Sequence, residues 1–209
     1  MTTTEEISTK PITATIPKNI LRAALASVEP CRGKDKTRPI LAAVRLEIHA
    51  GELKATATDS YTLAKYRHET ESGNFGPVVI AGAGVEAILN ATKAKGFGNV
   101  ELILDNGALT LDFGDARHVI ALEPETYPDT DSLIVEPGFG DAWNLEGCGF
   151  NAENLGRVAK VGKALQSSLR SATRVELITL LDNQRPARWS LTGDLGTVLF
   201  MIMPMRPKG

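Results

Sequence analysis

The sequence has few aromatic residues, only two cysteines and no long apolar run. Phe, Tyr and Trp make up 5% of the 209 residues, so an aromatic platform for stacking unpaired bases is not expected. Cys31 and Cys148 have no partners at metal-site spacing; we expect reduced thiols, with a single disulfide left open. No apolar stretch is long enough to span a bilayer, and residues 1–10 lack the apolar core of a secretion signal. These absences predict a cytoplasmic protein without a membrane segment.

The composition is that of a folded protein without an evident catalytic centre. Hydrophobic residues make up 43% and charged residues 23%, as in globular chains. The formal net charge of −2 excludes a uniformly basic protein but allows a local basic surface. His49, His68 and His118 fall on expected strands without spaced partners, so we expect them to be structural. No paired carboxylates, nucleophile elbow or phosphate-binding loop is present, so we expect no enzymatic activity, no metal and no cofactor.

A pattern of one strand, one helix and three strands recurs three times, which predicts three βαβββ units. Hairpin-linked strands form antiparallel sheets, and one helix per unit can cover one sheet face, so the predicted fold class is α+β. We expect a flexible tail (1–10), a domain of two units (11–128), a linker (129–143) and the third unit (144–209). The expected strands are 12–16, 43–50, 52–59, 61–68, then 78–80, 100–104, 108–113, 116–122, then 144–150, 175–181, 187–192, 197–203, with helices at 18–28, 84–95 and from Asn151, a plausible N-cap, to about 171.

Positive charge is concentrated in the expected helical regions. Residues 17–38 carry six basic and two acidic side chains, a net charge of +4. Residues 84–95 carry two basic and one acidic side chain, a net charge of +1, and residues 151–174 carry five basic and one acidic side chain, a net charge of +4. These regions sum to +9, so the rest of the chain sums to −11.

The third expected helix is amphipathic when its residues are spaced by about 100°. Its apolar side holds Val158, Leu165 and Leu169, and its basic side holds Lys160, Lys163, Arg170 and Arg174. The basic side is either an ordinary solvated surface or one that binds duplex phosphates without reading the base sequence. The shared sign of all three helical regions favours DNA binding.

Residues 78–87, VVIAGAGVEA, contain a G-x-G-x-x-A pattern formed by Gly82, Gly84 and Ala87 between an expected strand and an expected helix. Asp105 lies 23 residues after Gly82, near the position of a ribose-binding acid, so the pattern alone suggests a dinucleotide-binding oxidoreductase. However, the next strand turns back at Asn106-Gly107 into a hairpin, whereas a dinucleotide fold continues with parallel units. Dinucleotide binding is therefore the less favoured alternative.

Three motifs, in their order along the chain, resemble the bacterial sliding clamp family, the beta subunit of DNA polymerase III. Residues 38–64, RPILAAVRLEIHAGELKATATDSYTLA, hold a Pro-Ile-Leu step, a hairpin and a Thr-Asp-x-x-x-Leu-Ala turn. Residues 125–133, ETYPDTDSL, are similar to the Phe-Pro-Asp segment that closes a clamp domain. Residues 200–206, FMIMPMR, are similar to the family's Met-Pro-Met-Arg ending. The resemblance extends over about residues 11–207.

The resemblance implies a ring around duplex DNA, with helices lining the hole and antiparallel sheets outside. The chain would act as a processivity factor for a DNA polymerase and would need a clamp-loader ATPase to open it. The expected DNA contacts are Lys18, Arg22, Lys93, Lys160, Lys163, Arg170 and Arg174, with Arg32, Lys34 and Lys36 on a flanking loop. A DNA-binding accessory protein that does not encircle its target is the alternative.

The resemblance also implies an apolar pocket that receives short peptides from the polymerase and the loader. Methionines suit a surface that must accept several peptides. Carried over to this sequence, the pocket wall is Leu41, Thr58, Ser60, Leu63, Pro128, Leu133, Met203, Pro204 and Met205.

The number of units departs from the family pattern, because the bacterial protein has six per chain and this chain has three. Its compact size suggests a phage or plasmid protein that works in a bacterial cell or an infected host. By the same resemblance, a ring contains twelve βαβββ units. Three units per chain then favour a ring of four chains, with a trimer or a dimer as alternatives. The third unit would have no mate in its own chain and would expose a sheet edge, which favours pairing with the same unit of a second chain.

Overall fold

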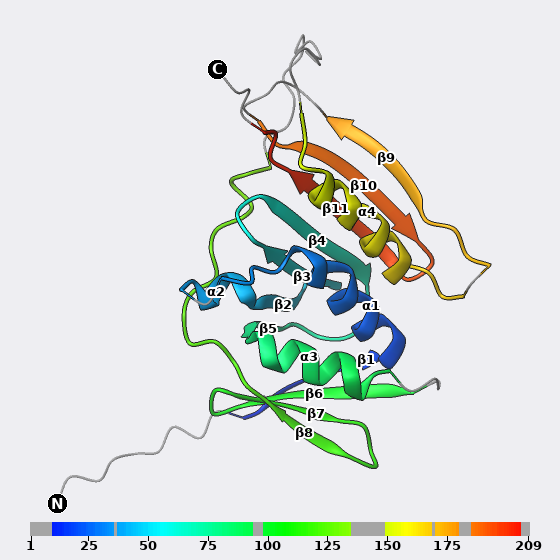
Figure 1. Ribbon diagram of the computed structural model, residues 1–209. Helices are drawn as coiled ribbons and strands as arrows, with labels where there is room; N and C mark the ends of the chain where they lie inside the picture. Colours follow the sequence, from blue (N-terminus) through cyan, green and yellow to red (C-terminus); the bar gives the residue numbers. More distant parts are fainter. Residues whose placement is uncertain are drawn as a thin grey trace, which may run out of the picture.

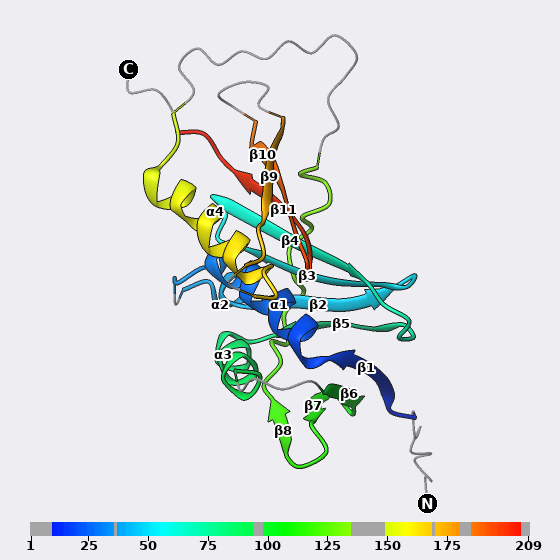
Figure 2. The ribbon, with the colours of Figure 1, turned by 90° about the vertical axis from the view of Figure 1, so that its right-hand side faces the viewer.

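The computed structural model describes residues 10–35, 37–93, 98–134, 149–168, 170–179 and 185–205. Three long helices, α1 (Lys18–Val28), α3 (Gly82–Ala91) and α4 (Ala152–Ala164), follow one another along one side, with the sheets behind them (Figures 1 and 2). Helix α1 lies between the other two and contacts both. This arrangement confirms the predicted α+β class with a helix layer on a sheet layer.

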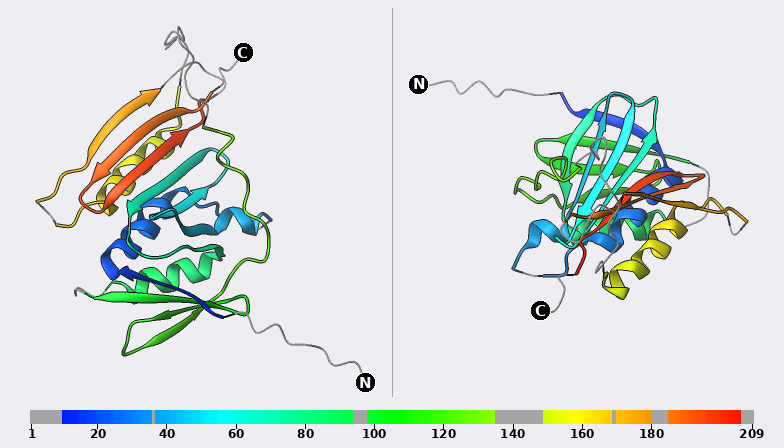
Figure 3. Two further views of the ribbon diagram at one scale, coloured as in Figure 1. Left: turned by 180° about the vertical axis from the view of Figure 1, so that it is seen from behind. Right: turned by 90° about the horizontal axis from the view of Figure 1, so that it is seen from above.

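Two antiparallel sheets form the other layer (Figure 3). The four-stranded sheet has the order β1 (Ile12–Pro17), β6 (Asn99–Asp105), β7 (Ala108–Asp112), β8 (Arg117–Ile120). The seven-stranded sheet has the order β5 (Phe75–Ile80), β2 (Val44–His49), β3 (Glu52–Thr58), β4 (Thr62–Glu69), β11 (Gly196–Ile202), β10 (Ala187–Gly193), β9 (Arg174–Thr179).

The first two units exchange their first strands. Strand β1 of the first unit pairs with β6 of the second, and β5 of the second unit pairs with β2 of the first. Each unit therefore completes the sheet of the other, which makes residues 11–128 one interlocked body rather than two adjacent units.

The third unit joins the first through its last strand, because β11 pairs with β4 over the register from Thr197–Arg67 to Ile202–Thr62. We expected the third unit to find no partner within its own chain. This expectation is wrong for strand β11, which pairs with strand β4 of the first unit. Its other edge strand, β9, pairs only with β10 among the described strands. Most of the predicted strand 144–150 lies outside the described residues; within them, Gly149 forms a single bridge to Met205.

Helix α1 shows how the sequence fixes the core. Pro30 ends it, because a proline cannot continue the helical hydrogen bonds, and the chain passes into a short 3-10 turn η1 (Glu29–Cys31). Leu21, Leu25 and Val28 recur at helical spacing and are fully buried against the sheet. Two short elements, η1 and α2 (Pro39–Ala42), were not predicted from the sequence.

Helix α4 begins as predicted and ends earlier. The Asn151 side chain accepts hydrogen bonds from the amides of Glu153 (2.8 Å) and Asn154 (3.4 Å), which confirms it as the N-cap. The helix stops at Ala164, where the carbonyl of Leu165 accepts the amide of Leu195 at 3.1 Å and Gly193 packs against Leu165. This contact with the β10–β11 hairpin turns the chain away from the helical path.

The G-x-G-x-x-A pattern has a packing role in this fold. All ladders between the described strands are antiparallel, which contradicts the parallel sheet that a dinucleotide fold requires. A Cβ on Gly84 would lie 2.7 Å from Ile120 Cγ2, so this glycine lets α3 approach β8 closely. Gly82 begins α3 and Ala87 lies exposed on it. The dinucleotide-binding fold that the pattern suggested is therefore contradicted.

Candidate nucleic-acid and peptide interfaces

Some of the predicted DNA-contact residues are exposed to solvent, and others already bond to groups within the protein. Lys160 and Lys163 are exposed on α4, Lys93 is exposed just after α3, and Lys34 and Arg170 lie exposed on connecting segments. Lys18 is half-buried at the start of α1, and Lys36 lies outside the described residues. The basic helix surface in the described chain is therefore narrower than the sequence suggested.

Three of the predicted arginines already have partners within the protein: Arg22, Arg32 and Arg174, of which Arg174 forms an ion pair with Glu176 at 2.6 Å. Arg22 on α1 donates to the carbonyl of Leu89 on α3 at 2.5 Å, so it links two helices. Arg32 has a side chain only 10% exposed and donates to the carbonyl of Ala42 at 2.8 Å. The helix-wheel assignment of Arg174 is wrong, because Arg174 begins strand β9. Arg170 likewise follows the end of α4 and does not share its basic face.

The predicted peptide-pocket residues come from four separate parts of the chain: α2, the β3–β4 turn, the segment after β8 and the segment after β11. The β3–β4 turn supplies Thr58, Ser60 and Leu63, of which Ser60 has φ +77°. The chain after β11 joins this turn, because the amide of Met203 donates to the carbonyl of Tyr61 at 2.8 Å. The helix α2, which carries Leu41, is linked to the same turn at its N-cap, where Arg38 Nη1 donates to Ser60 Oγ at 3.4 Å.

The segment after β8 is also fixed to this region. The amide of Thr58 donates to the hydroxyl of Tyr127 at 3.1 Å, and Lys65 on β4 forms an ion pair with Asp131. The Lys65 hydrogen bond holds the pKa of the Asp131 carboxyl below its usual range. Pro128 is half-buried within this segment and Leu133 is half exposed at its end.

The pocket residues differ in their availability to a ligand. Leu41, Thr58 and Leu63 are 8%, 7% and 3% exposed, so these side chains are buried and offer little surface to a ligand. The apolar side chains that reach solvent in this part of the chain are Tyr61, Leu133, Met203 and Met205, with 64%, 50%, 38% and 50% exposure. Pro204 between the two methionines is half-buried. Tyr61 was not among the predicted residues, although it lies within the Thr-Asp-x-x-x-Leu-Ala motif.

A buried ion pair joins the β3–β4 turn to α4. Asp59 Oδ2 accepts a 2.5 Å hydrogen bond from Arg157 Nη1, and the two side chains are 13% and 17% exposed. Asp59 Oδ1 accepts the amides of Tyr61 and Thr62 at 3.0 and 2.8 Å. Burial acts to raise the pKa of Asp59, but the hydrogen bonds from Arg157, Thr62 and Tyr61 outweigh it and hold the pKa below its ordinary value. Sequence reasoning counted Arg157 among the helix cations and missed this pair.

Cys31 lies beside the same pair and is fully buried as a free thiol. Burial, offset in part by a hydrogen bond with Thr62, raises the pKa of the Cys31 thiol to about 12. The thiolate needed for nucleophilic or redox chemistry is therefore not formed near neutral pH. Cys148 lies outside the described residues.

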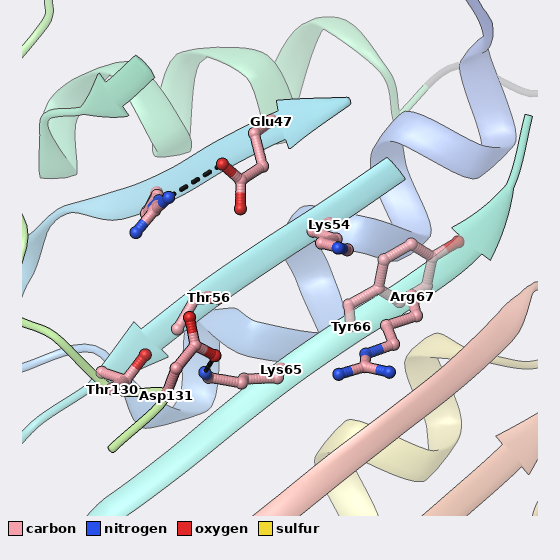
Figure 4. A pocket seen from close by; sticks show the side chains of 9 residues that line it. Glu47, Lys54, Thr56, Lys65, Tyr66, Arg67, Thr130 and Asp131 are labelled. Atoms are coloured by element: carbon pink, nitrogen blue, oxygen red, sulfur yellow. Dashed lines mark hydrogen bonds and ion pairs between the residues drawn. The ribbon is translucent and has the colours of Figure 1, made fainter. Parts of the chain in front are cut away.

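The outer face of β2, β3 and β4 carries a small polar hollow of about 70 Å³ (Figure 4). Three of its cations form ion pairs with neighbouring carboxylates: Arg45 with Glu47 (2.8 Å), Lys54 with Glu52 (3.2 Å) and Lys65 with Asp131. This surface is not apolar, so it does not correspond to the predicted peptide pocket. It also shows that positive charge is not confined to the helix side.

The described residues contain no group of His, Cys, Asp and Glu that could hold a metal ion. None of the helices described is both long and apolar enough to cross a membrane.

Comparison with known proteins points to one family. The model of the DNA polymerase III beta subunit central domain matches residues 15–129. The beta sliding clamp of Staphylococcus aureus is 26% identical over 117 residues, which cover 56% of this chain and 31% of that protein. The matched part thus spans about a third of the length of these curated relatives.

Solved structures extend the likeness to the whole chain. The DNA polymerase III beta subunit of Thermotoga maritima superimposes with a TM-score of 0.76 at 15% identity, covering 100% of this chain and 68% of that one. The sliding clamp of Pseudomonas aeruginosa gives 0.74 at 16% identity, covering 93% and 66%. That of Bartonella birtlesii gives 0.72 at 16% identity, covering 99% and 69%. These similarities show that the third unit follows the same fold.

Proposed function

The chain belongs to the DNA polymerase III beta subunit family, and we propose that it is a DNA sliding clamp. In this role it is a non-enzymatic processivity factor that encircles duplex DNA and tethers a replicative polymerase. A clamp-loader ATPase from another chain opens the ring. The ring is a homo-oligomer, with four chains favoured by the unit count and two or three as alternatives.

One observation carries the proposal: the three long helices form one side of the molecule and the sheets the other (Figure 2). Lys160 and Lys163 are exposed on the helix side and lie about one turn apart on the same face of α4. Phosphate contacts are weak, salt-dependent and independent of base sequence, which lets a ring slide. We propose Lys18, Lys93 and Lys34 as further DNA contacts. Arg170, which is exposed after the end of α4, is proposed as a contact at the edge of this surface.

The apolar surface around Met203 is proposed as the site for polymerase and loader peptides. Tyr61, Met203 and Met205 offer exposed apolar groups, and methionine adapts to differently shaped ligands. The backbone hydrogen bond between Met203 and Tyr61 makes the surface a property of two units together. A peptide bound there would contact the first and third units at once.

The test of the DNA face is a charge reversal with a matched control. The double variant Lys160→Glu, Lys163→Glu is compared with Lys54→Glu, Arg67→Glu on the outer sheet, which makes the same change in net charge. Binding to two duplexes of equal length and unrelated sequence is measured by anisotropy over a range of salt. We expect the α4 variant to bind both duplexes less well and to lower the salt slope by about two. Equal weakening by the control, or loss on one sequence only, would contradict the proposal.

A further inference from the structure

The polar hollow on the outer face of β2, β3 and β4 carries more positive than negative charge (Figure 4). Four cationic and two carboxylate side chains line it, so its formal charge is +2, in a chain whose net charge is −2. Its volume of about 70 Å³ is roughly five times what one water molecule requires, so the hollow has room for a carboxylate group. The hollow therefore favours an anionic ligand.

Arg67 is the cation of this hollow whose charge is not compensated. In the antiparallel register of β3 and β4, Arg67 lies directly opposite Lys54. Like charges in directly opposite positions of a sheet are destabilising. Lys54 has a carboxylate partner, Glu52, at 3.2 Å, whereas Arg67 is exposed and forms no ion pair within the described part of the chain. An anion held beside Arg67 would relieve the repulsion between the two cations.

Two hydroxyl groups and one buried ammonium group add further donors. Thr56 and Thr130 line the hollow and are 8% and 6% exposed, and neither hydroxyl has a hydrogen-bond partner among the described residues. Buried hydroxyls normally have such a partner. Lys65 is two residues before Arg67 on β4, so both side chains lie on the same face of the sheet. The ammonium group of Lys65 has one carboxylate partner, Asp131, which is itself 78% exposed.

The hollow is continuous with the surface proposed for polymerase and loader peptides. Residues two apart on a strand share one face of the sheet and are about 7 Å apart. Three residues of the hollow are each two positions from a predicted pocket residue: Thr56 from Thr58, Lys65 from Leu63, and Thr130 from Pro128. A peptide that lies on the pocket can therefore reach the hollow with its neighbouring residues.

We propose that the hollow is a subsite for an acidic side chain, Asp or Glu, of a peptide whose apolar residues lie on the surface around Met203. Carboxylate oxygens accept hydrogen bonds from guanidinium, ammonium and hydroxyl groups alike. Arg67 supplies the uncompensated charge, and Lys65 and the two threonine hydroxyls supply the remaining donors. This inference rests on the proposed function, because the surface proposed there holds the apolar part of the peptide.

The test uses the full chain and three fluorescent synthetic peptides. The peptides share one apolar core of leucine and phenylalanine and differ in their flanks, which carry aspartate, serine or lysine on both sides. Anisotropy at low salt should give the aspartate peptide about fivefold higher affinity than the serine peptide, the upper effect of one exposed ion pair. Arg67→Gln should abolish this preference and keep the affinity for the serine peptide. Arg117→Gln is the matched control, because it removes an exposed arginine from a strand of the other sheet, and it should keep the preference.

Asp131→Asn distinguishes an acidic subsite from a purely structural role of these residues. The variant removes the carboxylate that competes for Lys65, so the preference for the aspartate peptide should exceed that of the unaltered protein. A structural role would instead weaken binding of all three peptides alike, because Asp131 fixes the segment after β8 to β4. Equal affinity for the aspartate and serine peptides, or a preference that survives in Arg67→Gln, would overturn the inference.

Met203→Ala tests the proposed peptide surface separately. This variant should weaken binding of all three peptides and leave the preference for aspartate unchanged, because Met203 contributes an apolar group and no charge. Binding that depends on Met203 but not on the charge of the flanks would overturn the acidic subsite and leave the proposed function standing. Affinities unchanged by Met203→Ala would refute the proposed peptide surface, and the inference with it.

Discussion

Removal of the Asp59–Arg157 ion pair should loosen the third unit and the peptide surface together. The pair joins the β3–β4 turn to α4, and both side chains are mostly buried, at 13% and 17% exposure. Removing one partner of a buried ion pair costs about 3–5 kcal/mol, because the remaining charge is left without compensation. In Asp59→Asn, Arg157 keeps its 2.8 Å hydrogen bond to Thr62 Oγ1, so its charge retains one partner. We therefore expect a loss in the free energy of unfolding near the lower end of this range, about 3 kcal/mol.

The assay is urea unfolding of the unaltered protein, Asp59→Asn, Arg157→Gln and the double variant at pH 7. The double-mutant cycle should give a coupling free energy of about 2 kcal/mol, within the range for residues in direct contact. The control is Asp112→Asn, whose partner Arg117 has a side chain 73% exposed, and it should cost less than about 1 kcal/mol. A coupling below about 0.5 kcal/mol would refute the reasoning.

The same pair predicts a pH dependence with a defined sign. The pKa of Asp59 is lower in the folded protein than in the unfolded chain, so its contribution is complete above the unfolded value. That contribution is lost as the pH falls through the folded pKa. Asp59→Asn should therefore lose less stability than the unaltered protein on acidification. If the free energy of unfolding fell equally steeply with decreasing pH in both proteins, this assignment would be contradicted.

Three further predictions concern single positions. Met203→Ala should weaken binding of a polymerase-derived peptide by about 2 kcal/mol in calorimetry while the melting temperature stays within a few degrees, because Met203 is 38% exposed; unchanged affinity would remove it from the site. Cys31 should stay unmodified by a thiol reagent in the folded protein at pH 8 and react once urea unfolds the chain, because burial raises its pKa to about 12; rapid reaction of the folded chain would contradict this. Ala50→Gly should raise the free energy of unfolding by about 1 kcal/mol, because Ala50 has φ +53° in the β2–β3 turn, and a loss of stability would show that the strain is absent.

The sequence predicted most accurately those features that depend on near neighbours. The helix predicted at 18–28 matches α1 because apolar residues at helical spacing lie between two prolines. The turn at Asn106-Gly107 was predicted because both residues tolerate the positive φ values, +48° and +76°, that a tight hairpin requires.

Features that depend on contacts between distant segments were not predicted. The exchange of β1 and β5 leaves no local signal, because a strand has the same alternation whichever unit it pairs with. The end of α4 is fixed by the β10–β11 hairpin, and the apolar spacing that extended the predicted helix to 171 continued past it.

The candidate site was predicted in part for the same reason. The motif residues around Thr58 and Met203 come together as the family resemblance implied, since Met203 bonds to the β3–β4 turn. The roles of Arg22, Arg32 and Arg157 as internal partners could not be read from charge counts. A count of cations on a helix does not distinguish those that face solvent from those that bridge elements.

The most direct test of the central claim is topological retention on DNA. The unaltered protein at high concentration is allowed to thread onto a linear duplex that carries biotin at both ends, and streptavidin then blocks the ends. Gel filtration at moderate salt should keep the protein with the blocked duplex, and a single restriction cut should release it. An equal loss from blocked and open duplexes would contradict encirclement and would assign the basic helix face to ordinary, non-encircling DNA binding.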